Sequence, residues 1–259
     1  MTDPTGEPRV VVADNADVPD LTADSIVRGL VGAIDARGVA HWATTGGSTP
    51  AAVYRSMLQP ARRDQVDWDR VHLWWGDDRF VPRDHPLSNV KAVDEILLDA
   101  DTGLAIPADH LHPFRAAEAI GAGLDCAACA AAMGEELAQE GPSSPGGWPV
   151  FDLIFLGVGA DGHLMSVFPG SAAFDAETWT VAIPSPTHIE PHVERVTMHP
   201  AIVTAARDVL VTVTGASKAD VLADLFGSVR EPRRWPAQVA RNERATWILD
   251  REAAARLPR

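Results

Sequence analysis

An aspartate and a histidine two positions apart, Asp161 and His163, have the residue types and the spacing for acid–base chemistry. They follow the apolar run 153–156, which is short and bulky enough to be a buried parallel strand, and glycines interrupt the run where that strand would end. In open α/β sheets, ligands bind just outside the carboxyl ends of the strands. Histidine is the side chain most often used to move protons near neutral pH. The sequence therefore predicts a site here, with His163 as its candidate base.

A second loop, 45–50, reads Thr-Gly-Gly-Ser-Thr-Pro and lies between a predicted strand at 39–44 and a predicted helix at 51–58. Its glycines allow backbone N–H groups to approach a ligand, and the start of a helix favours negative charge. Pro50 suits the first turn of that helix, with Ser48 or Thr49 near its N-cap. The loop indicates an anion site, although an ordinary capped helix start would have the same composition.

Two more predicted strands, 71–75 and 208–214, are followed by charged residues. The first leads into Asp77 and Arg79, which form either a surface ion pair of little worth or part of a site. The second leads to Lys218 in the first turn of a predicted helix, where a cation opposes the helix dipole unless an anion binds beside it. Because all these loops follow strands, we expect them to converge at one edge of the sheet.

Predicted strands and helices alternate along the chain, which is typical of an α/β protein with a mainly parallel, Rossmann-like sheet and helices on both faces. We expect a single domain spanning residues 1–259. The remaining expected elements are an edge strand at 9–13, a helix at 20–37, a helix at 90–98, an irregular excursion at 99–113, a long helix at 118–140, strands at 179–183 and 195–198 flanking an irregular flap at 184–194, helical turns at 200–206, a helix at 219–226, a strand at 245–249 and a terminal helix from 250.

Three glycines at 157–162 match the dinucleotide-binding pattern G-x-G-x-x-G after a predicted strand. That motif normally opens a domain and leads into a long helix, whereas here about 150 residues precede it and Phe-Pro-Gly at 168–170 stops any long helix. The chain also lacks the P-loop spacing and the G-x-S-x-G elbow of serine hydrolases. The sequence therefore argues against nicotinamide, P-loop and serine-nucleophile chemistry.

Histidines and cysteines are the remaining candidates for a metal site. Cys126 and Cys129 form a single C-x-x-C in an alanine-rich segment, and we interpret them as two small residues on a helix. The histidine pairs 110/112 and 188/192 lie in proline-flanked segments, and we interpret both as surface residues rather than zinc ligands.

The composition excludes several classes of partner. The chain of 259 residues has a net charge of −14, which argues against a nucleic acid or an anionic membrane as partner. No apolar run approaches the roughly 20 residues of a membrane span, and the first residues lack the features of a signal peptide. We expect a cytoplasmic protein, a monomer or small homo-oligomer, that binds any phosphate through local donors and a few cations.

Several motifs together resemble the 6-phosphogluconolactonase family and, more loosely, the glucosamine-6-phosphate deaminase and isomerase superfamily. The motifs occur in the family's order over nearly the full length, and they are TGGSTP at 45–50, GDDRFVP at 76–82, SN at 88–89, GVGADGH with SVFPGS at 157–171, ERVTMHPAI at 194–202, TGASK at 214–218 and the tail WILDREAAARL. The resemblance implies hydrolysis of 6-phosphogluconolactone to 6-phosphogluconate in the oxidative pentose phosphate pathway, with no metal and no organic cofactor.

The resemblance also implies roles for individual residues. His163 would be the general base that activates water, and Asp161 would orient or support it. Arg79 and Arg195 would bind the phosphate or the developing oxyanion. The remaining substrate-binding residues would be Gly46, Gly47, Ser48, Thr49, Asp77 and Lys218.

Three positions depart from the family's usual pattern: Asp78 stands where Glu is usual, Met165 where Ala is usual, and His199 near a usual Leu or Thr. Two rival functions remain. An amino-sugar phosphate deaminase or isomerase would need a carboxylate to shuttle a proton, and Asp77 could serve. A non-catalytic sugar-phosphate sensor would usually carry a basic DNA-binding segment, and none is visible.

Overall fold

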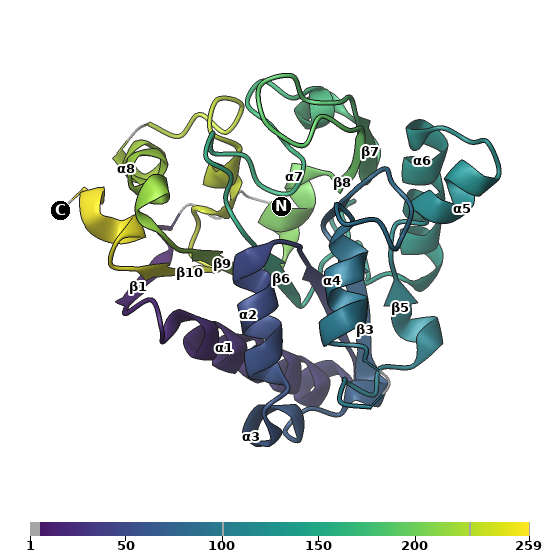
Figure 1. Ribbon diagram of the computed structural model, residues 1–259, viewed down its shortest axis with the longest axis horizontal. Coiled ribbons are helices and arrows are strands. Elements are labelled where there is room, and N and C mark those ends of the chain that lie inside the picture. Colours follow the sequence, from purple (N-terminus) through teal and green to yellow (C-terminus); the bar gives the residue numbers. More distant parts are fainter. Residues whose placement is uncertain (1–5, 100, 228, 259) are drawn as a thin grey trace.

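The main sheet of the computed structural model is parallel throughout. The structure describes residues 6–99, 101–227 and 229–258, and within them seven strands pair in the order β1-β10-β9-β6-β2-β3-β5 (Figure 1). Their bounds are β1 Arg9–Ala13, β2 Ala40–Thr44, β3 Val71–Trp75, β5 Leu111–His112, β6 Leu153–Leu156, β9 Asp208–Val213 and β10 Ala245–Asp250.

Helices cover this sheet. The described residues form α1 Val18–Arg37, α2 Ser48–Met57, α3 Pro60–Arg63, α4 Asn89–Ile96, α5 Ala116–Gly121, α6 Cys126–Glu140, α7 Pro200–Ala205 and α8 Ala219–Gly227. The apolar stripe of α1 packs against β2, β6, β9 and β10, and α2 packs on α1. All four residues of β6 are buried, although successive side chains point to opposite faces, so both faces of the sheet are covered. The predicted α/β fold is confirmed.

A second, antiparallel sheet lies beside the first and was not expected. It has the order β4-β8-β7 in the described part of the chain, with bounds β4 Asp77–Arg79, β8 Arg195–Met198 and β7 Thr180–Ile183. Helix α6 packs against β7 and β8. The segment after β3, predicted as a loop, is therefore a strand, β4. It pairs with β8 in a register that places Arg79 opposite Arg195.

Three predicted elements were wrong. The helix at 118–140 is two helices, because α5 ends at Gly121, Gly123 has a positive φ of 70°, and the Asp125 side chain caps α6 by accepting from the Ala128 N–H. The excursion at 99–113 contains β5, which pairs with β3. The terminal helix from 250 is instead the end of β10 followed by one 3₁₀ turn, Ala253–Arg256.

The order of the strands fixes where a ligand can bind. From β2 the chain proceeds outward through β3 to β5, and from β6 it proceeds outward on the other side through β9 to β10. The order therefore reverses between β2 and β6, which is the switch point where α/β sheets bind their ligands. The loops after β2 and β6 are the two that carry the glycine-rich segment and His163.

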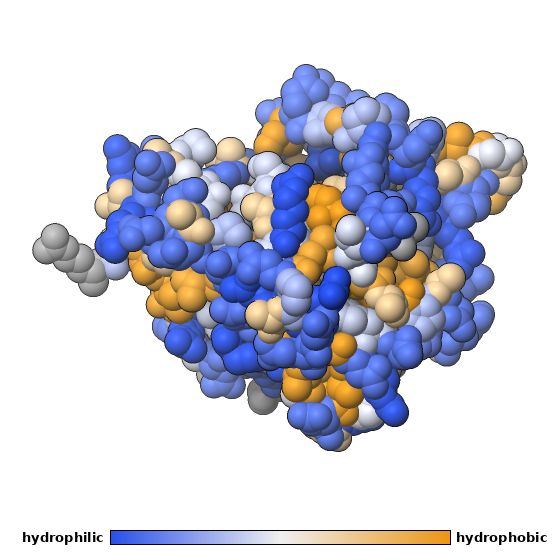
Figure 2. Space-filling view, turned by 60° about the horizontal axis from the view of Figure 1, so that its bottom comes forward, coloured by the Kyte–Doolittle hydropathy of each residue, from blue (hydrophilic) through white to orange (hydrophobic). Residues whose placement is uncertain are grey.

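The surface in view is mostly hydrophilic, with hydrophobic residues gathered in a few places (Figure 2). Large exposed apolar side chains in the described part of the chain are few, and Val10 and Val12 on the edge strand β1 are two of them. None of the described helices is long and apolar enough to cross a membrane.

Candidate active site

A cavity of about 320 Å³ lies at the switch point and brings the four strand-end loops together, as the sequence predicts. Every predicted site residue except Asp161 lines it. The lining is Thr45, Gly46, Gly47, Ser48, Thr49, Pro50, Asp77, Arg79, Asn89, Gly157, Val158, Gly159, His163, Met165, Arg195, Thr212, Val213, Thr214 and Lys218.

His163 and Asp161 are joined directly. The Nδ1 atom of His163 lies 2.5 Å from Oδ1 of Asp161, and the backbone N–H of His163 donates to the same oxygen at 3.2 Å. The backbone N–H of Gly159 donates to the His163 carbonyl, and a Cβ at residue 159 would lie only 2.0 Å from Nδ1 of the ring. Only glycine therefore fits there. Because a carboxylate accepts from Nδ1–H, the other ring nitrogen, Nε2, is the one left with a lone pair.

A second histidine, His188, contacts the other oxygen of the same carboxylate: its Nε2 lies 2.9 Å from Oδ2 of Asp161. Burial would raise the pKa of Asp161, but hydrogen bonds and charge from His163 and a hydrogen bond from His188 hold it well below its ordinary value. Asp161 is therefore an anion at neutral pH. Sequence reasoning placed His188 on the surface; the contact was missed because a histidine in an irregular segment carries no pattern that predicts its partner.

Three cations face the cavity. Arg79 donates through Nη1 to the Leu87 carbonyl at 2.7 Å, and Arg195, only 2% exposed, donates through Nη2 to the Pro191 carbonyl at 3.0 Å. Lys218 donates to the Val158 carbonyl at 2.8 Å.

None of the three forms an ion pair within residues 6–99, 101–227 and 229–258, and there the Nε atoms of Arg79 and Arg195 are buried without a hydrogen-bond partner. Burial and the charge of the nearby Arg79 lower the pKa of Arg195. Burial also lowers the pKa of Lys218. Buried cations that form no ion pair are costly, so a bound anion would stabilise this cavity.

The glycine-rich loop presents the start of α2 to these cations. The cap residue is Gly47 with φ of 115°, and no side-chain hydrogen bond caps the helix. The helix begins at Ser48, so the prediction that Ser48 or Thr49 lies near the N-cap is confirmed. The N–H groups of the first helical turn have no acceptor within the helix and suit an anion. A Cβ at Gly46 would lie 2.0 Å from Oδ1 of Asn89, so glycine is required for this close approach. Lys218 lies not in a helix but in a 3₁₀ turn, Ala216–Lys218, directly before α8.

The aspartates after β3 differ from each other. Asp77 lines the cavity, where its Oδ2 accepts from the Ser166 hydroxyl at 2.6 Å and its Oδ1 from the Asn89 amide at 3.2 Å. Asp78 is buried away from the cavity and accepts from the backbone N–H groups of Asn89 and Arg79 at 2.7 and 2.8 Å. Burial raises the pKa of Asp78 to about 7, although those hydrogen bonds oppose the rise. Asp78 thus tethers β4 to α4.

Of the other two departures, Met165 lines the cavity and has a positive φ of 51°. The third, His199, caps α7 by accepting from the Ala201 N–H at 3.0 Å and stacks on Trp148 at 4.3 Å.

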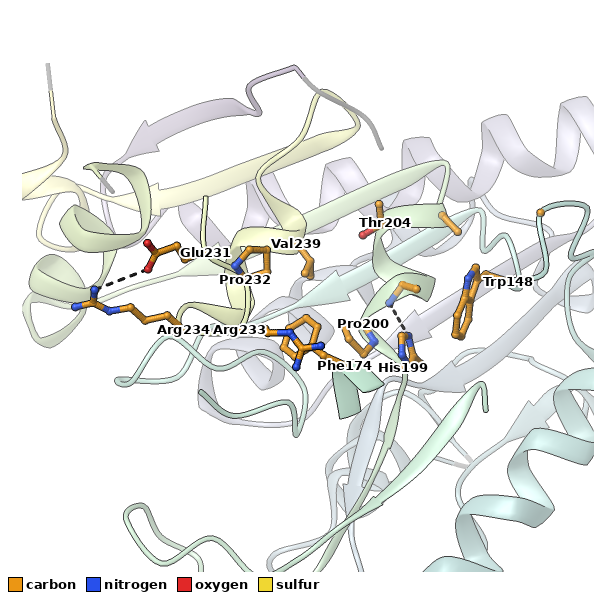
Figure 3. A pocket seen from close by; sticks show the side chains of 13 residues that line it. Trp148, Phe174, His199, Pro200, Thr204, Glu231, Pro232, Arg233, Arg234 and Val239 are labelled. Atoms are coloured by element: carbon orange, nitrogen blue, oxygen red, sulfur yellow. Dashed lines mark hydrogen bonds and ion pairs between the residues drawn. The ribbon is translucent and has the colours of Figure 1, made fainter. Parts of the chain in front are cut away.

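His199 and Trp148 line a larger cavity of about 790 Å³, outside the predicted site (Figure 3). Its charged residues are paired: Arg233 with Asp175, and Arg234 with Glu231. Apolar and aromatic side chains make up most of the rest of its wall, among them Phe174, Pro200, Pro232 and Val239.

The histidine pair 110/112 was expected at the surface, and for His112 this was wrong. His112 is buried, its Nε2 lies 3.0 Å from Nδ1 of His72 and its Nδ1 lies 2.8 Å from Glu136. The rings of His41, His72 and His110 stack in one row. Among the described residues, no group of three or more histidine, cysteine or acidic side chains could hold a metal ion.

The two cysteines are buried on α6, as interpreted from the sequence. Burial raises the pKa of the Cys126 thiol to about 12 and that of the Cys129 thiol to about 11. Both thiols are therefore unreactive at neutral pH.

The fold and the site define an α/β protein with a cavity at a sheet switch point, in which three cations lie near a histidine–carboxylate pair. The chain belongs to the family of glucosamine-6-phosphate isomerases and 6-phosphogluconolactonases, whose model matches residues 13–248. This confirms the resemblance found from the motifs.

Individual relatives are consistent with the same family. A 6-phosphogluconolactonase of Mycobacterium tuberculosis is 34% identical over 96% of this chain and 98% of its own length. The structure of a 6-phosphogluconolactonase from Trypanosoma cruzi superposes with a TM-score of 0.82 at 26% identity, covering 100% of both chains. A monomeric glucosamine-6-phosphate deaminase, 16% identical with a TM-score of 0.75 over 96% of this chain and 99% of its own, shares the fold.

Proposed function

We propose that this protein hydrolyses 6-phosphogluconolactone to 6-phosphogluconate, with His163 as the general base. The observation that carries the proposal is one cavity that contains a histidine held by a carboxylate together with three cations that form no ion pair in the described part of the chain. A phosphorylated lactone matches both features, because it brings an anion and an activated ester. The family membership and the 34% identical lactonases support the same reaction.

The phosphate is proposed to bind between Lys218 and the loop at 46–49. Lys218 supplies a charged donor and the start of α2 supplies backbone N–H groups, and both belong to the cavity lining. Arg79 and Arg195 lie in register on neighbouring strands and share the remaining charge between the phosphate and the lactone carbonyl. This arrangement would hold the sugar phosphate in a protein whose net charge of −14 opposes it.

In the proposed reaction, Nε2 of His163 takes a proton from a water molecule as the water oxygen attacks the lactone carbonyl carbon. Charge develops on the carbonyl oxygen and is stabilised by an arginine in the cavity. Collapse of the intermediate breaks the ring C–O bond, and the imidazolium returns its proton to the departing ring oxygen. Asp161, an anion at neutral pH, stabilises the charged ring in between.

An amino-sugar phosphate deaminase is the alternative within the same family. It would use a cavity carboxylate to move a proton between neighbouring carbons, and Asp77 lies in the cavity. Asp77 is held by Ser166 and Asn89, which suits a fixed positioning group.

The test measures proton release after addition of freshly made 6-phosphogluconolactone, corrected for spontaneous hydrolysis. Ammonia release from glucosamine 6-phosphate is measured in parallel. We expect the first and not the second. Ammonia release without accelerated lactone hydrolysis would replace the proposal by the deaminase. Because the proposed substrate is a metabolic sugar phosphate, we also propose that the protein is cytoplasmic.

A further inference from the structure

The carboxylate of Asp161 is shared by two imidazoles, and only one of them reaches the cavity. His163 lines the cavity and takes Oδ1; His188 does not line it and takes Oδ2 at 2.9 Å. His188 belongs to the irregular segment 184–194, which sequence reasoning predicted as a flap. The two rings, which come from separate segments of the chain, therefore contact both oxygens of one carboxylate.

A common aromatic partner joins the two histidines. The ring of Phe168 lies 4.8 Å from His163 and 5.5 Å from His188, between ring centroids, and the guanidinium of Arg195 lies 5.2 Å from the same centroid. The flap is anchored to the site a second time, because the Pro191 carbonyl accepts from Nη2 of Arg195. His188 is thus packed into the site although its side chain is 50% exposed.

We infer that His188 is a positioning residue for the hydrolysis proposed above, acting through Asp161 on the base His163. The inference rests on that proposed function. A carboxylate held only by His163 can rotate about its side-chain bonds, and the imidazole can then lose its orientation toward the substrate. The donor from His188 fixes the plane of the carboxylate, so Oδ1 stays on Nδ1 and Nε2 stays directed at the cavity.

The second effect is on protonation. A donor on Oδ2 withdraws part of the negative charge of Asp161, and a protonated His188 would compensate more of it. Either way, less negative charge remains on Asp161 to stabilise the cation that His163 becomes when it accepts a proton. The protonation of His163 also depends on the other charged and titratable groups of the site, which are Asp161, His188, Lys218, Arg195 and Arg79.

The test compares His188→Ala, His188→Gln and His192→Ala. Gln keeps an N–H donor at the distance of Nε2 and cannot be charged. His192 lies in the same flap, donates from Nδ1 to the Pro186 carbonyl at 2.6 Å and pairs with Glu190, so its loss disturbs the flap without touching Asp161.

We expect His188→Ala to lower kcat about tenfold with KM nearly unchanged, since a half-exposed hydrogen bond to a charged group is worth the lower end of its usual range. The acid limb of the kcat/KM profile should move to higher pH. His188→Gln should recover most of kcat, and His192→Ala should resemble the wild type.

A direct readout uses no substrate. Titration of the His163 ring by NMR should move to higher pH in His188→Ala and stay in place in His192→Ala. If lactone hydrolysis is absent from the wild type but this shift is present, the proposed function fails while the coupling of the two histidines stands. Unchanged kcat and titration in a folded His188→Ala, an equal loss in His192→Ala, or no recovery in His188→Gln would each overturn the inference.

Discussion

Two cavities in the described part of the chain differ in the charge of their walls more than in their volume. The larger, about 790 Å³, is lined mostly by apolar and aromatic side chains, and its charged residues all form ion pairs. The smaller, about 320 Å³, holds three cations that form no ion pair within the described residues. An unpaired cation at a buried position costs free energy unless a ligand compensates it, so the charge rather than the volume identifies the binding site.

The origin of this difference is topological. The smaller cavity lies at the switch point, where parallel strands lead into helix starts whose N–H groups lack acceptors within the helix, so donors are present there by geometry alone. The larger cavity is built from α7, a 3₁₀ turn at Pro236–Ala240 and surface loops, where side chains satisfy one another. The predictions below test whether the chemistry stays within the smaller cavity.

The largest expected effect is that of His163→Ala. Removal of a general base should lower kcat by about 10²–10⁴-fold, while phosphate binding, which uses other residues, should be nearly unchanged. Initial rates of proton release and calorimetry with 6-phosphogluconate measure the two effects. A variant that keeps more than about a tenth of wild-type turnover would show that His163 is not the base.

Asp161→Asn should have a smaller effect than His163→Ala. The amide keeps the shape of the side chain but removes the negative charge that stabilises the imidazolium and fixes its tautomer. Rates are measured across pH, with circular dichroism as the control for folding. A loss as severe as that of His163→Ala, with the fold intact, would make Asp161 itself the base.

Lys218→Ala should act on binding. A charged hydrogen bond to phosphate is worth about 1.5–3 kcal/mol, or about tenfold to a hundredfold in affinity. Calorimetry should show weaker binding of both 6-phosphogluconate and inorganic phosphate, and the preference for the phosphorylated lactone over gluconolactone should shrink. Unchanged affinity for both ligands would assign the phosphate to Arg79 and Arg195.

The row of stacked histidines should make the stability of the folded protein depend on pH in the acid range. Burial, together with repulsion from neighbouring histidines, lowers the pKa of His41 to about 3 and that of His72 to about 4. Asp109 opposes the shift at His72, and Glu136, which pairs with Arg115, contacts His112.

In the unfolded chain His41 and His72 bind protons near pH 6.5, whereas in the folded chain they do not. The free energy of unfolding therefore decreases as pH falls from about 6.5 toward 4. The loss is at most about 1.4 kcal/mol per histidine per pH unit, and less where water screens the ring. Urea unfolding midpoints at several pH values test this. Equal midpoints at neutral pH and at pH near 5 would contradict it.

Much of the site could be predicted because its signals are local. An apolar run followed by glycines gives a strand and its loop, and the residues of that loop follow by sequence position, as for His163 and Asp161. Parallel pairing then brings loops far apart in the sequence to one edge, so the convergence of Lys218 with the glycine-rich loop was also predictable.

Other features depend on contacts that no local pattern encodes. The strand β5 has two residues, too short for any periodicity, and its His112 is buried because His72 and Glu136 satisfy both ring nitrogens. The contact of His188 with Asp161 spans 27 positions through an irregular segment. The break between α5 and α6, by contrast, had a signal in Gly121 and Gly123 that the alanine-rich composition outweighed.

The smallest expected effect is that of Arg233→Ala, in the larger cavity. The Arg233 side chain is 61% exposed, pairs with Asp175 and lies over the ring of Phe174, so its charge is already compensated and screened. Its removal should leave the rates with the lactone and the affinity for phosphate unchanged, which makes it the matched control for Lys218→Ala. If Arg233→Ala weakened phosphate binding as much as Lys218→Ala does, the larger cavity would hold the sugar phosphate. Paired charge would then be no guide to where this protein binds its substrate.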